Sequence, residues 1–185
     1  LELEVETRPG RSLQRIREAH TWIPLPYMQS DPIRASLAMF LSEFMGSVLR
    51  NNEPQPELFA YIARSIHLLD RINNGLGNFH LCFLIGLTSY MGITPNTDGY
   101  QRGTYFDMQE GIFVPEQPLF NPSLQPDEAT FMIKLLRMNF ANLHLYRFSR
   151  GERNIILDRI ITYYSIHLSG MGQLSSPAVL HALFD

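Results

Sequence analysis

The sequence predicts a mainly α-helical protein: a C-terminal helical bundle with a small β-hairpin insertion, preceded by a short stretch of strands. Three observations lead to this fold class. Apolar residues recur with helical spacing from residue 31 to the end of the chain. Residues 79–91 are apolar around most of the helix circumference, which is typical of the buried centre of a bundle. A polar, turn-rich segment at residues 92–115 interrupts the helices.

Length and composition are those of an ordinary globular protein. A chain of 185 residues usually forms one domain, or one domain plus a fragment, and it can bury a sizeable core. Hydrophobic residues make up 45% and charged residues 18%, which excludes a disordered chain. No apolar run reaches the ~18 residues of a membrane span, and no leader is visible. The single cysteine, Cys82, excludes internal disulfides and suits a reducing cytoplasm.

The first 25 residues differ from the rest of the chain. Leu1, Leu3 and Val5 alternate with glutamates, which predicts a half-buried strand. Residues 8–11 then form a turn, and residues 13–19 fit either a second strand or a short helix. Since two strands alone are marginally stable in water, we expect this segment to be the tail of a larger sheet.

The helices from residue 31 onward have clear start signals. Asp31 is an N-cap before Pro32, and Ser149 with Glu152 forms a capping box. Further helices are expected near residues 56, 79, 126 and 177. The side chains predicted to face the core are Ile33, Leu37, Phe40, Leu41, Phe44, Val48, Leu58, Phe59, Ile62, Ile66, Leu69, Phe131, Met132, Leu135, Leu136, Ile156, Ile160, Tyr164, Val179, Leu180 and Leu183.

The insertion at residues 92–115 divides into a turn region and a hairpin. Residues 96–103 are dense in turn formers. Residues 104–108 and 111–114 are two short β-prone runs around Gln109–Glu110, so we expect a small hairpin.

We find no convincing catalytic set. The chain contains no HExxH, GxSxG, P-loop or GxGxxG motif. Cys82 stands among apolar neighbours, which indicates a buried, inert thiol. The six histidines are scattered along the chain: His20, His67, His80, His144, His167 and His181. We therefore predict no enzyme activity, no catalytic residues, no metal site and no cofactor.

Two arginine clusters are the better functional candidates. The net charge of −3 argues against a purely electrostatic nucleic-acid binder, yet Lys134 is the single lysine, so nearly all positive charge is guanidinium. Each cluster could contact phosphate, or could instead be solvated and paired with neighbours such as Glu18 and Glu152. The candidate nucleic-acid residues are Arg8, Arg11, Arg15 and Arg17 in the N-terminal segment, and Arg147, Arg150 and Arg153 at the start of the last long helix.

A succession of segments covers essentially the whole chain. In order they are RPGR, LQRIREA, DPIRASLAMFLSEF, PQPELFAYIARSIHLLD, NFHLCFLIGLTSYMGITPN, YFDMQEGIF, NLHLYRFSRGERNIIL and YYSIHLSGMGQLSSPAVL. This succession resembles the RecO family of bacterial DNA-repair proteins, most closely the members that lack zinc. None of the segments is a chemical motif by itself, so the resemblance depends on their order.

The resemblance implies two domains, an N-terminal OB-type barrel and a C-terminal helical domain. Residues 1–25 would be the C-terminal strands of a truncated OB-fold domain. Residues 26–185 would be the RecO-like helical domain with its hairpin insertion at 92–115. OB barrels bind single strands through a basic groove and aromatic platforms, and only the four N-terminal arginines would remain of that surface.

The resemblance also implies a function in DNA repair and recombination, without enzymatic chemistry. Such a protein binds single- and double-stranded DNA, anneals strands, works with RecR and through it RecF, and helps RecA replace single-strand-binding protein. The implied location is the bacterial cytoplasm, at the nucleoid. The helical domain would dock the acidic, apolar C-terminal tail of single-strand-binding protein, which needs an apolar pocket rimmed by arginine. Arg64 and Arg71 are the candidates for that rim.

Two other functions stay open. The chain could be a protein-interaction module only, which binds RecR or the tail while DNA binding resides in the missing barrel. An enzyme would need a site that the sequence does not show.

Much of the RecO family carries a cysteine-rich, zinc-bound loop at the place of the insertion. Four thiolates would hold such a loop closed, but here Asn96, Thr97, Asp98 and Gly99 fill those positions. We therefore expect no zinc. The hairpin should hold by its own hydrogen bonds and by packing Tyr105, Phe106, Ile112 or Phe113 against the bundle.

Overall fold

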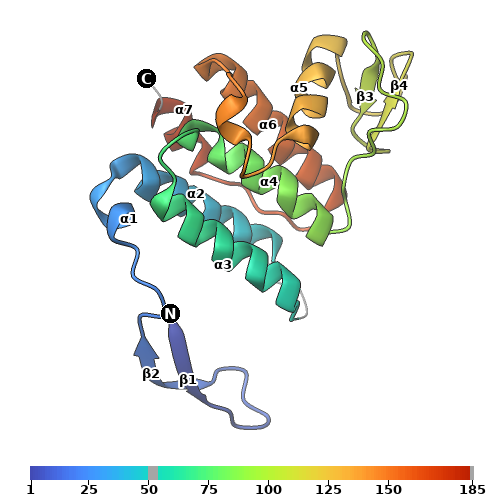
Figure 1. Cartoon of the computed structure of the whole chain (residues 1–185). Coiled ribbons are helices and arrows are strands. Elements are labelled where there is room, and N and C mark those ends of the chain that lie inside the picture. The colour runs from blue at the N-terminus through green and yellow to red at the C-terminus, as the bar shows by residue number, and fades with distance from the viewer. Residues whose placement is uncertain (50–53, 184–185) are drawn as a thin grey trace.

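The computed structural model describes residues 1–49 and 54–183 and, within them, every side chain except that of Leu183. Its helices are α1 (Pro26–Ser30), α2 (Pro32–Val48), α3 (Pro56–Arg71), α4 (Phe79–Tyr90), α5 (Pro126–Arg137), α6 (Arg150–His167) and α7 (Pro177–Leu183), with single 3₁₀ turns at Leu76–Asn78 and Leu143–Leu145. Its strands are β1 (Glu2–Glu6), β2 (Arg15–His20), β3 (Tyr105–Asp107), β4 (Ile112–Val114) and β5 (Ser123–Leu124). The helices form a bundle, the β1–β2 ribbon projects from it, and the small sheet lies at another corner (Figure 1). The predicted helical bundle with small sheets is confirmed.

Helix α4 is the centre of the core. It lies between the α2–α3 pair and the α5–α6 pair (Figure 1). Phe79, Phe83 and Leu84 have no exposed surface, and the Tyr164 hydroxyl of α6 donates a hydrogen bond of 2.7 Å to the Leu84 carbonyl. The ring of Tyr164 also meets Phe44 of α2 edge-on, with centroids 4.9 Å apart. The uniformly apolar sequence of α4 is thus explained by neighbours on nearly every side.

The predicted helix caps are present. The Asp31 carboxylate accepts hydrogen bonds from the backbone N–H of Ile33 at 2.9 Å and of Arg34 at 3.4 Å. At the start of α6, Ser149 Oγ accepts from the Glu152 N–H at 3.2 Å, while the Glu152 carboxylate accepts from the Ser149 N–H at 2.6 Å. These bonds lower the pKa of Glu152. Each cap satisfies backbone donors that the first helical turn leaves unpaired.

Two side chains predicted to face the core face solvent instead. Phe59 is 64% exposed and Val179 is 56% exposed, while the other described members of the predicted core are buried or half-buried. The buried stripe of α3 follows Leu58 and Leu69, so Phe59 points about 100° away from it. Its ring stacks on Trp22 with centroids 6.0 Å apart.

The N-terminal segment is an antiparallel ribbon. β1 pairs with β2 from Glu2 opposite His20 to Glu6 opposite Arg15, with a bulge after Glu4, so residues 13–19 favour a strand and not a helix. The predicted half-burial is wrong: Leu1, Leu3 and Val5 are 83%, 47% and 43% exposed. Within the described residues the ribbon is a two-stranded sheet that projects from the bundle (Figure 1), and the apolar side chains of one face remain largely exposed.

The insertion contains the expected hairpin, and a strand that follows it in the chain, β5, joins the same sheet. β3 pairs with β4 and also with β5, which the sequence prediction missed because two residues carry no alternating pattern. Phe106 and Phe113 are buried as expected, and Phe106 lies 5.9 Å from the Tyr163 ring of α6. Ile112 is 37% exposed, so it does not anchor the hairpin.

Candidate functional site

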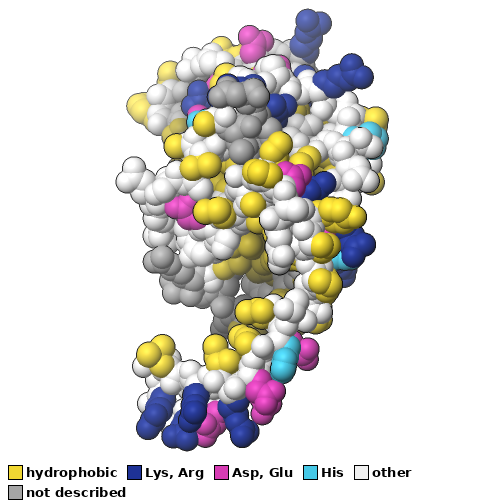
Figure 2. Space-filling model, turned by 90° about the vertical axis from the view of Figure 1, so that its left-hand side faces the viewer, with side chains coloured by type: hydrophobic (Ala, Val, Ile, Leu, Met, Phe, Trp, Pro, Cys, Tyr) yellow, Lys and Arg dark blue, Asp and Glu magenta, His cyan; other side chains and the backbone are white. Residues whose placement is uncertain are grey.

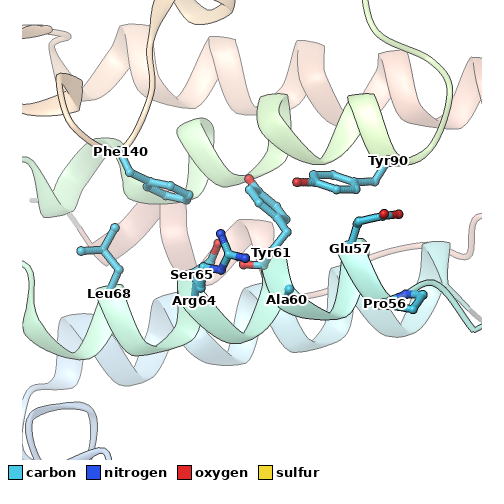
Figure 3. Close-up of a pocket in the computed structure, with 9 residues that line it drawn as sticks. All are labelled: Pro56, Glu57, Ala60, Tyr61, Arg64, Ser65, Leu68, Tyr90 and Phe140. Atoms are coloured by element: carbon cyan, nitrogen blue, oxygen red, sulfur yellow. The ribbon is translucent and has the colours of Figure 1, made fainter.

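A pocket of about 440 Å³ lies between α3 and α4. Its volume is within the ~300–1,000 Å³ of typical ligand-binding pockets. Helix α3 supplies most of the wall, Tyr90 comes from the end of α4, and Phe140 comes from the link between α5 and α6 (Figure 3). The lining residues are Pro56, Glu57, Ala60, Tyr61, Arg64, Ser65, Leu68, Tyr90 and Phe140. The site therefore joins three segments that are distant in sequence.

Aromatic rings form one wall of this pocket. The Tyr61 ring stacks on Tyr90 at 4.8 Å and on Phe83 at 5.4 Å, and it lies 6.1 Å from Phe140. The Tyr61 hydroxyl donates a hydrogen bond of 2.8 Å to the Phe83 carbonyl. Burial raises the pKa of Tyr61, so the hydroxyl remains a donor. A Cβ at Gly86 would lie 2.4 Å from that hydroxyl, which is why α4 has glycine here.

Two charged side chains of α3 line the pocket: Glu57 near the Tyr90 end and Arg64 about two helical turns further along the helix. Figure 3 shows Tyr61 between Phe140 and Tyr90, with Arg64 on the Phe140 side and Glu57 below Tyr90. Arg64 is exposed, so its guanidinium can meet a carboxylate brought by a ligand. The pocket thus combines an apolar aromatic wall with one exposed basic group.

The structure places one of the two predicted rim arginines at this pocket. Arg64 lines it, whereas Arg71 is exposed about two turns further along α3 and is not among the lining residues. The sequence reasoning missed Tyr61, Tyr90 and Phe140. Tyr61 could have been noticed because it precedes Arg64 by one helical turn, but no sequence signal connects Tyr90 and Phe140 to α3.

The four N-terminal arginines are exposed on the ribbon. Arg8 Nη2 lies 2.8 Å from a Glu6 carboxylate oxygen, and Arg17 Nη1 lies 3.4 Å from Glu4. Arg15 and Arg17 share a polar hollow with Glu6, and Arg11 stands in the turn. Basic and acidic side chains alternate along the outer edge of the ribbon (Figure 2). Exposed ion pairs of this kind contribute only about 0–1 kcal/mol, so a phosphate could compete for the arginines.

The arginines near α6 differ from the phosphate-binding cluster that the sequence suggests, because two of the three donate hydrogen bonds to backbone carbonyls. Arg150 donates two hydrogen bonds, of 3.0 and 2.6 Å, to the His181 carbonyl of α7. Arg153 donates one of 2.7 Å to the Phe148 carbonyl, and burial lowers the pKa of its guanidinium. Arg147 is exposed. The structure does not bring this cluster to the ribbon: the start of α6, beside α7, and the ribbon lie at different ends of the molecule (Figure 1).

The residues of the insertion do not fit a zinc site. The Cys82 thiol is buried in α4, where burial raises its pKa to about 12, and residues 96–99 offer no thiolate or imidazole. Among residues 1–49 and 54–183, no three His, Cys, Asp or Glu side chains are grouped so that they could share a metal ion. Burial also lowers the pKa of His80 to about 3, which keeps this histidine neutral.

A hydrogen-bond network around Asp107 holds the insertion instead. Its Oδ1 accepts from the backbone N–H of Gln109 at 2.9 Å and of Glu110 at 3.0 Å, and its Oδ2 accepts from the Asn121 amide at 2.9 Å. Asp107 is 5% exposed, so the acceptor of all three hydrogen bonds is buried. Across the described part of the chain, no helix has the length and hydropathy needed to cross a membrane.

Comparison with known proteins gives a consistent family. The profile described as "Recombination protein O C terminal" matches residues 29–177. A DNA repair protein RecO of Azobacteroides pseudotrichonymphae is 42% identical over 185 residues, all of this chain and 77% of the relative. The RecO proteins of Phocaeicola vulgatus and Bacteroides fragilis are 41% and 40% identical, again over 100% of this chain and 77% of each relative. These matches show that the chain belongs to the RecO family of DNA repair and recombination proteins.

Proposed function

We propose that this protein is a non-enzymatic recombination mediator that helps load the recombinase onto strands covered by single-strand-binding protein. Its helical bundle would dock the C-terminal tail of that binding protein, and its ribbon would contact DNA. One observation carries the proposal: the pocket between α3 and α4 combines an aromatic wall with the exposed Arg64 in its lining. This is the chemistry that an acidic, apolar tail requires.

The recognition of the tail follows from the pocket lining. An aromatic side chain of the tail would pack against Tyr61 and Phe140, where offset ring contacts add about 0.5–1.5 kcal/mol to the area buried. A tail carboxylate would accept hydrogen bonds from the Arg64 guanidinium, whose planar fork suits a carboxylate better than an ammonium does. Glu57, which lies near Tyr90 about two helical turns from Arg64, would repel a carboxylate and so fix the direction of the tail.

A peptide titration tests the docking. A fluorescein-labelled acidic peptide that ends in an aromatic residue and a free carboxylate is titrated with wild type, Arg64→Glu and Arg71→Glu. Arg71 is the matched control because it is exposed on the same helix but outside the pocket. We expect Arg64→Glu to weaken binding more than about tenfold, or 1.4 kcal/mol, and Arg71→Glu to change it less than about twofold. No binding by wild type, or equal effects of the two variants, would reject the docking.

DNA contact is the second part of the proposal. Arginines arrayed on a protein bind the phosphate backbone independently of sequence, and they lower the repulsion between two strands that anneal. The ribbon displays Arg8, Arg11, Arg15 and Arg17 without burying any of them. Binding of single- and double-stranded DNA, cooperation with RecR and RecF, and a place at the nucleoid in the cytoplasm belong to this proposal and follow the family resemblance.

Fluorescence anisotropy of a labelled single strand across a salt series tests the DNA contact. Each phosphate contact on a single strand contributes about −0.7 to the slope of log K against log salt concentration. We expect the slope to become shallower when the four ribbon arginines are changed to glutamine. Arg137→Gln is the control, since Arg137 is exposed at the end of α5, away from the ribbon, and is not a candidate nucleic-acid residue.

A protein-interaction module without DNA contact is the alternative. It is favoured by the pairing of Arg8 with Glu6 and of Arg17 with Glu4, which leaves the ribbon little excess positive charge. If micromolar protein shows no salt-sensitive binding, this alternative holds.

We further propose that residues 1–25 belong to an OB-type β domain and residues 26–185 to the helical domain. The support is the exposed apolar face of the ribbon, since a sheet with one apolar face needs a second layer to cover it.

A further inference from the structure

The loop between β4 and β5 carries two almost fully exposed apolar side chains. Leu119 is 90% exposed and the adjacent Phe120 is 95% exposed. Burying a leucine or phenylalanine side chain contributes about 1.5–3 kcal/mol each, so a pair left in water is a strong candidate for a binding contact. We call residues 116–120 the tip.

The structure holds the C-terminal side of this tip in place. Pro118 and Pro122 restrict the backbone around it. The Met108 N–H donates a hydrogen bond of 2.9 Å to the Pro122 carbonyl, and the Asn121 amide donates one of 2.9 Å to Asp107. Because the chain next to Phe120 is already fixed to the sheet, a partner would lose little free energy in ordering it.

We propose that the tip of one copy of this chain docks in the α3–α4 pocket of a second copy. The proposal rests on the proposed function in one respect, because both use the same pocket. The tip carries an acidic residue, a proline, a leucine and a phenylalanine, and its one charge is that of Glu116. This matches the aromatic wall and the basic Arg64 of the pocket.

The charges set the direction of docking. Glu116 is four residues from Phe120, at the other end of the tip. With Phe120 against the aromatic wall, the Glu116 carboxylate would be attracted by Arg64. It would be repelled by Glu57, which lies about two helical turns from Arg64 on α3. The apolar pair of the tip therefore suits the aromatic wall of the pocket, and its one negative charge suits Arg64.

The contact is between molecules and joins unlike surfaces. The small sheet that carries the tip lies at a corner of the molecule beyond α5, while the pocket opens between α3 and α4 (Figure 1). Repeated in one direction, a contact of one tip with one pocket forms head-to-tail chains; exchanged reciprocally between two copies, it closes a symmetric dimer. A tail peptide and a tip cannot occupy one pocket together, so self-association would be displaced when the tail binds.

Sedimentation velocity over a concentration series tests this proposal, with wild type, Arg64→Glu and the double variant Leu119→Ser/Phe120→Ser. We expect wild type to associate, and both variants to raise the dissociation constant more than about tenfold. Met39→Ser is the control, since Met39 is 71% exposed on α2 and should leave association unchanged. An equimolar mixture of the two variants should restore dimers, because one supplies the tip and the other the pocket.

Peptide binding measured on the same samples separates the two proposals. If wild type binds the tail peptide but stays monomeric up to a few hundred micromolar, the tip proposal fails and the proposed function stands. If Arg64→Glu and the double variant lose association while the peptide does not bind, the proposed function fails and the tip proposal stands. If the double variant still associates, or instead loses DNA binding as an apolar wedge between bases would, the tip does not dock in the pocket.

Discussion

At the scale of single residues, the α3–α4 pocket depends on a glycine that does not touch its ligand. Tyr61 can lie against α4 because Gly86 has no Cβ to meet its hydroxyl. The ring then stacks on Tyr90 and borders Phe140, and these contacts build the aromatic wall. The position of the Tyr61 ring, and with it the geometry of the wall, therefore depends on the close approach of the α4 backbone at Gly86.

Gly86→Ala should damage both the fold and the pocket. The added Cβ would lie 2.4 Å from the Tyr61 hydroxyl, so the ring must shift, and overpacking of this kind costs about 1–3 kcal/mol. We expect a lower midpoint of urea unfolding and weaker binding of the tail peptide. The control is Gly46→Ala on α2, where a Cβ meets nothing within 4 Å and helix propensity should add up to about 1 kcal/mol. Equal stability of the two variants would contradict this role of Gly86.

Sequence patterns predicted the role of a side chain correctly where its hydrogen-bond partners lie nearby in the sequence. The caps at Asp31 and Ser149 were readable because their partners lie two or three residues away. Arg64 was found at the pocket, but Arg150 and Arg153 turned out to hold backbone carbonyls. The sequence cannot distinguish an arginine at a helix start that contacts phosphate from one that donates to a backbone carbonyl.

At the scale of elements, two pieces of the fold are held by carboxylates. The first is α7, because the residues just before it are hydrogen-bonded to Glu43 of α2. The Glu43 carboxylate accepts hydrogen bonds of 2.8 Å from the backbone N–H of Ser175 and of Ser176, and a further one from the Ser176 hydroxyl. These bonds, the Ser176 hydroxyl first, lower the pKa of Glu43 below its ordinary value near 4.5.

This anchor predicts a loss of α7 docking at acid pH. Because the pKa is lower in the folded state, the stabilisation is present above the ordinary value and disappears as the pH falls through the folded pKa. Hydrogen exchange of the α7 amides, corrected for intrinsic rates, should accelerate in that range. Glu43→Gln should show fast exchange already at neutral pH and no such transition. Identical exchange profiles of wild type and Glu43→Gln would contradict the anchor.

The second such element is the insertion, which Asp107 holds without a metal. Asp107→Ala removes the acceptor of the Gln109 and Glu110 amides and of the Asn121 side chain, and hydrogen bonds to a charged group contribute about 1.5–3 kcal/mol. We expect a clear fall in melting temperature, whereas Asp98→Ala, at an exposed position of the same insertion, should change stability by less than about 0.5 kcal/mol. Adding a chelator to wild type should leave the melting temperature unchanged. A drop on chelation would show that an ion holds the insertion.

Elements with strong periodicity were predictable, and short ones were not. The apolar sequence of α4 and the capped starts of α2 and α6 gave their positions directly. Helix α1 and strand β5 were missed, because five residues and two residues carry too little pattern. Both depend on long-range hydrogen bonds, such as the one of 2.7 Å from the Met28 N–H to Asp70.

At the scale of the whole molecule, the bundle carries its functional candidates on separated surfaces. The ribbon arginines, the aromatic pocket and the tip come from different parts of the chain (Figure 1). Sequence patterns predicted the bundle, but they could not predict that Tyr90 and Phe140 meet α3. That proximity arises from how α4 and the α5–α6 link pack, which local periodicity does not encode.

A charge-swap cycle tests the central claim, that the pocket binds an acidic apolar peptide through Arg64. Dissociation constants are measured for wild type and Arg64→Glu, each with an acidic peptide and with the same peptide carrying lysine in place of the acidic residue next to its aromatic end. We predict that Arg64→Glu weakens the acidic peptide and strengthens the lysine peptide, with a coupling free energy of about 1 kcal/mol or more. Additive effects, within about 0.5 kcal/mol, would mean that Arg64 does not meet the peptide and that the pocket is not its binding site.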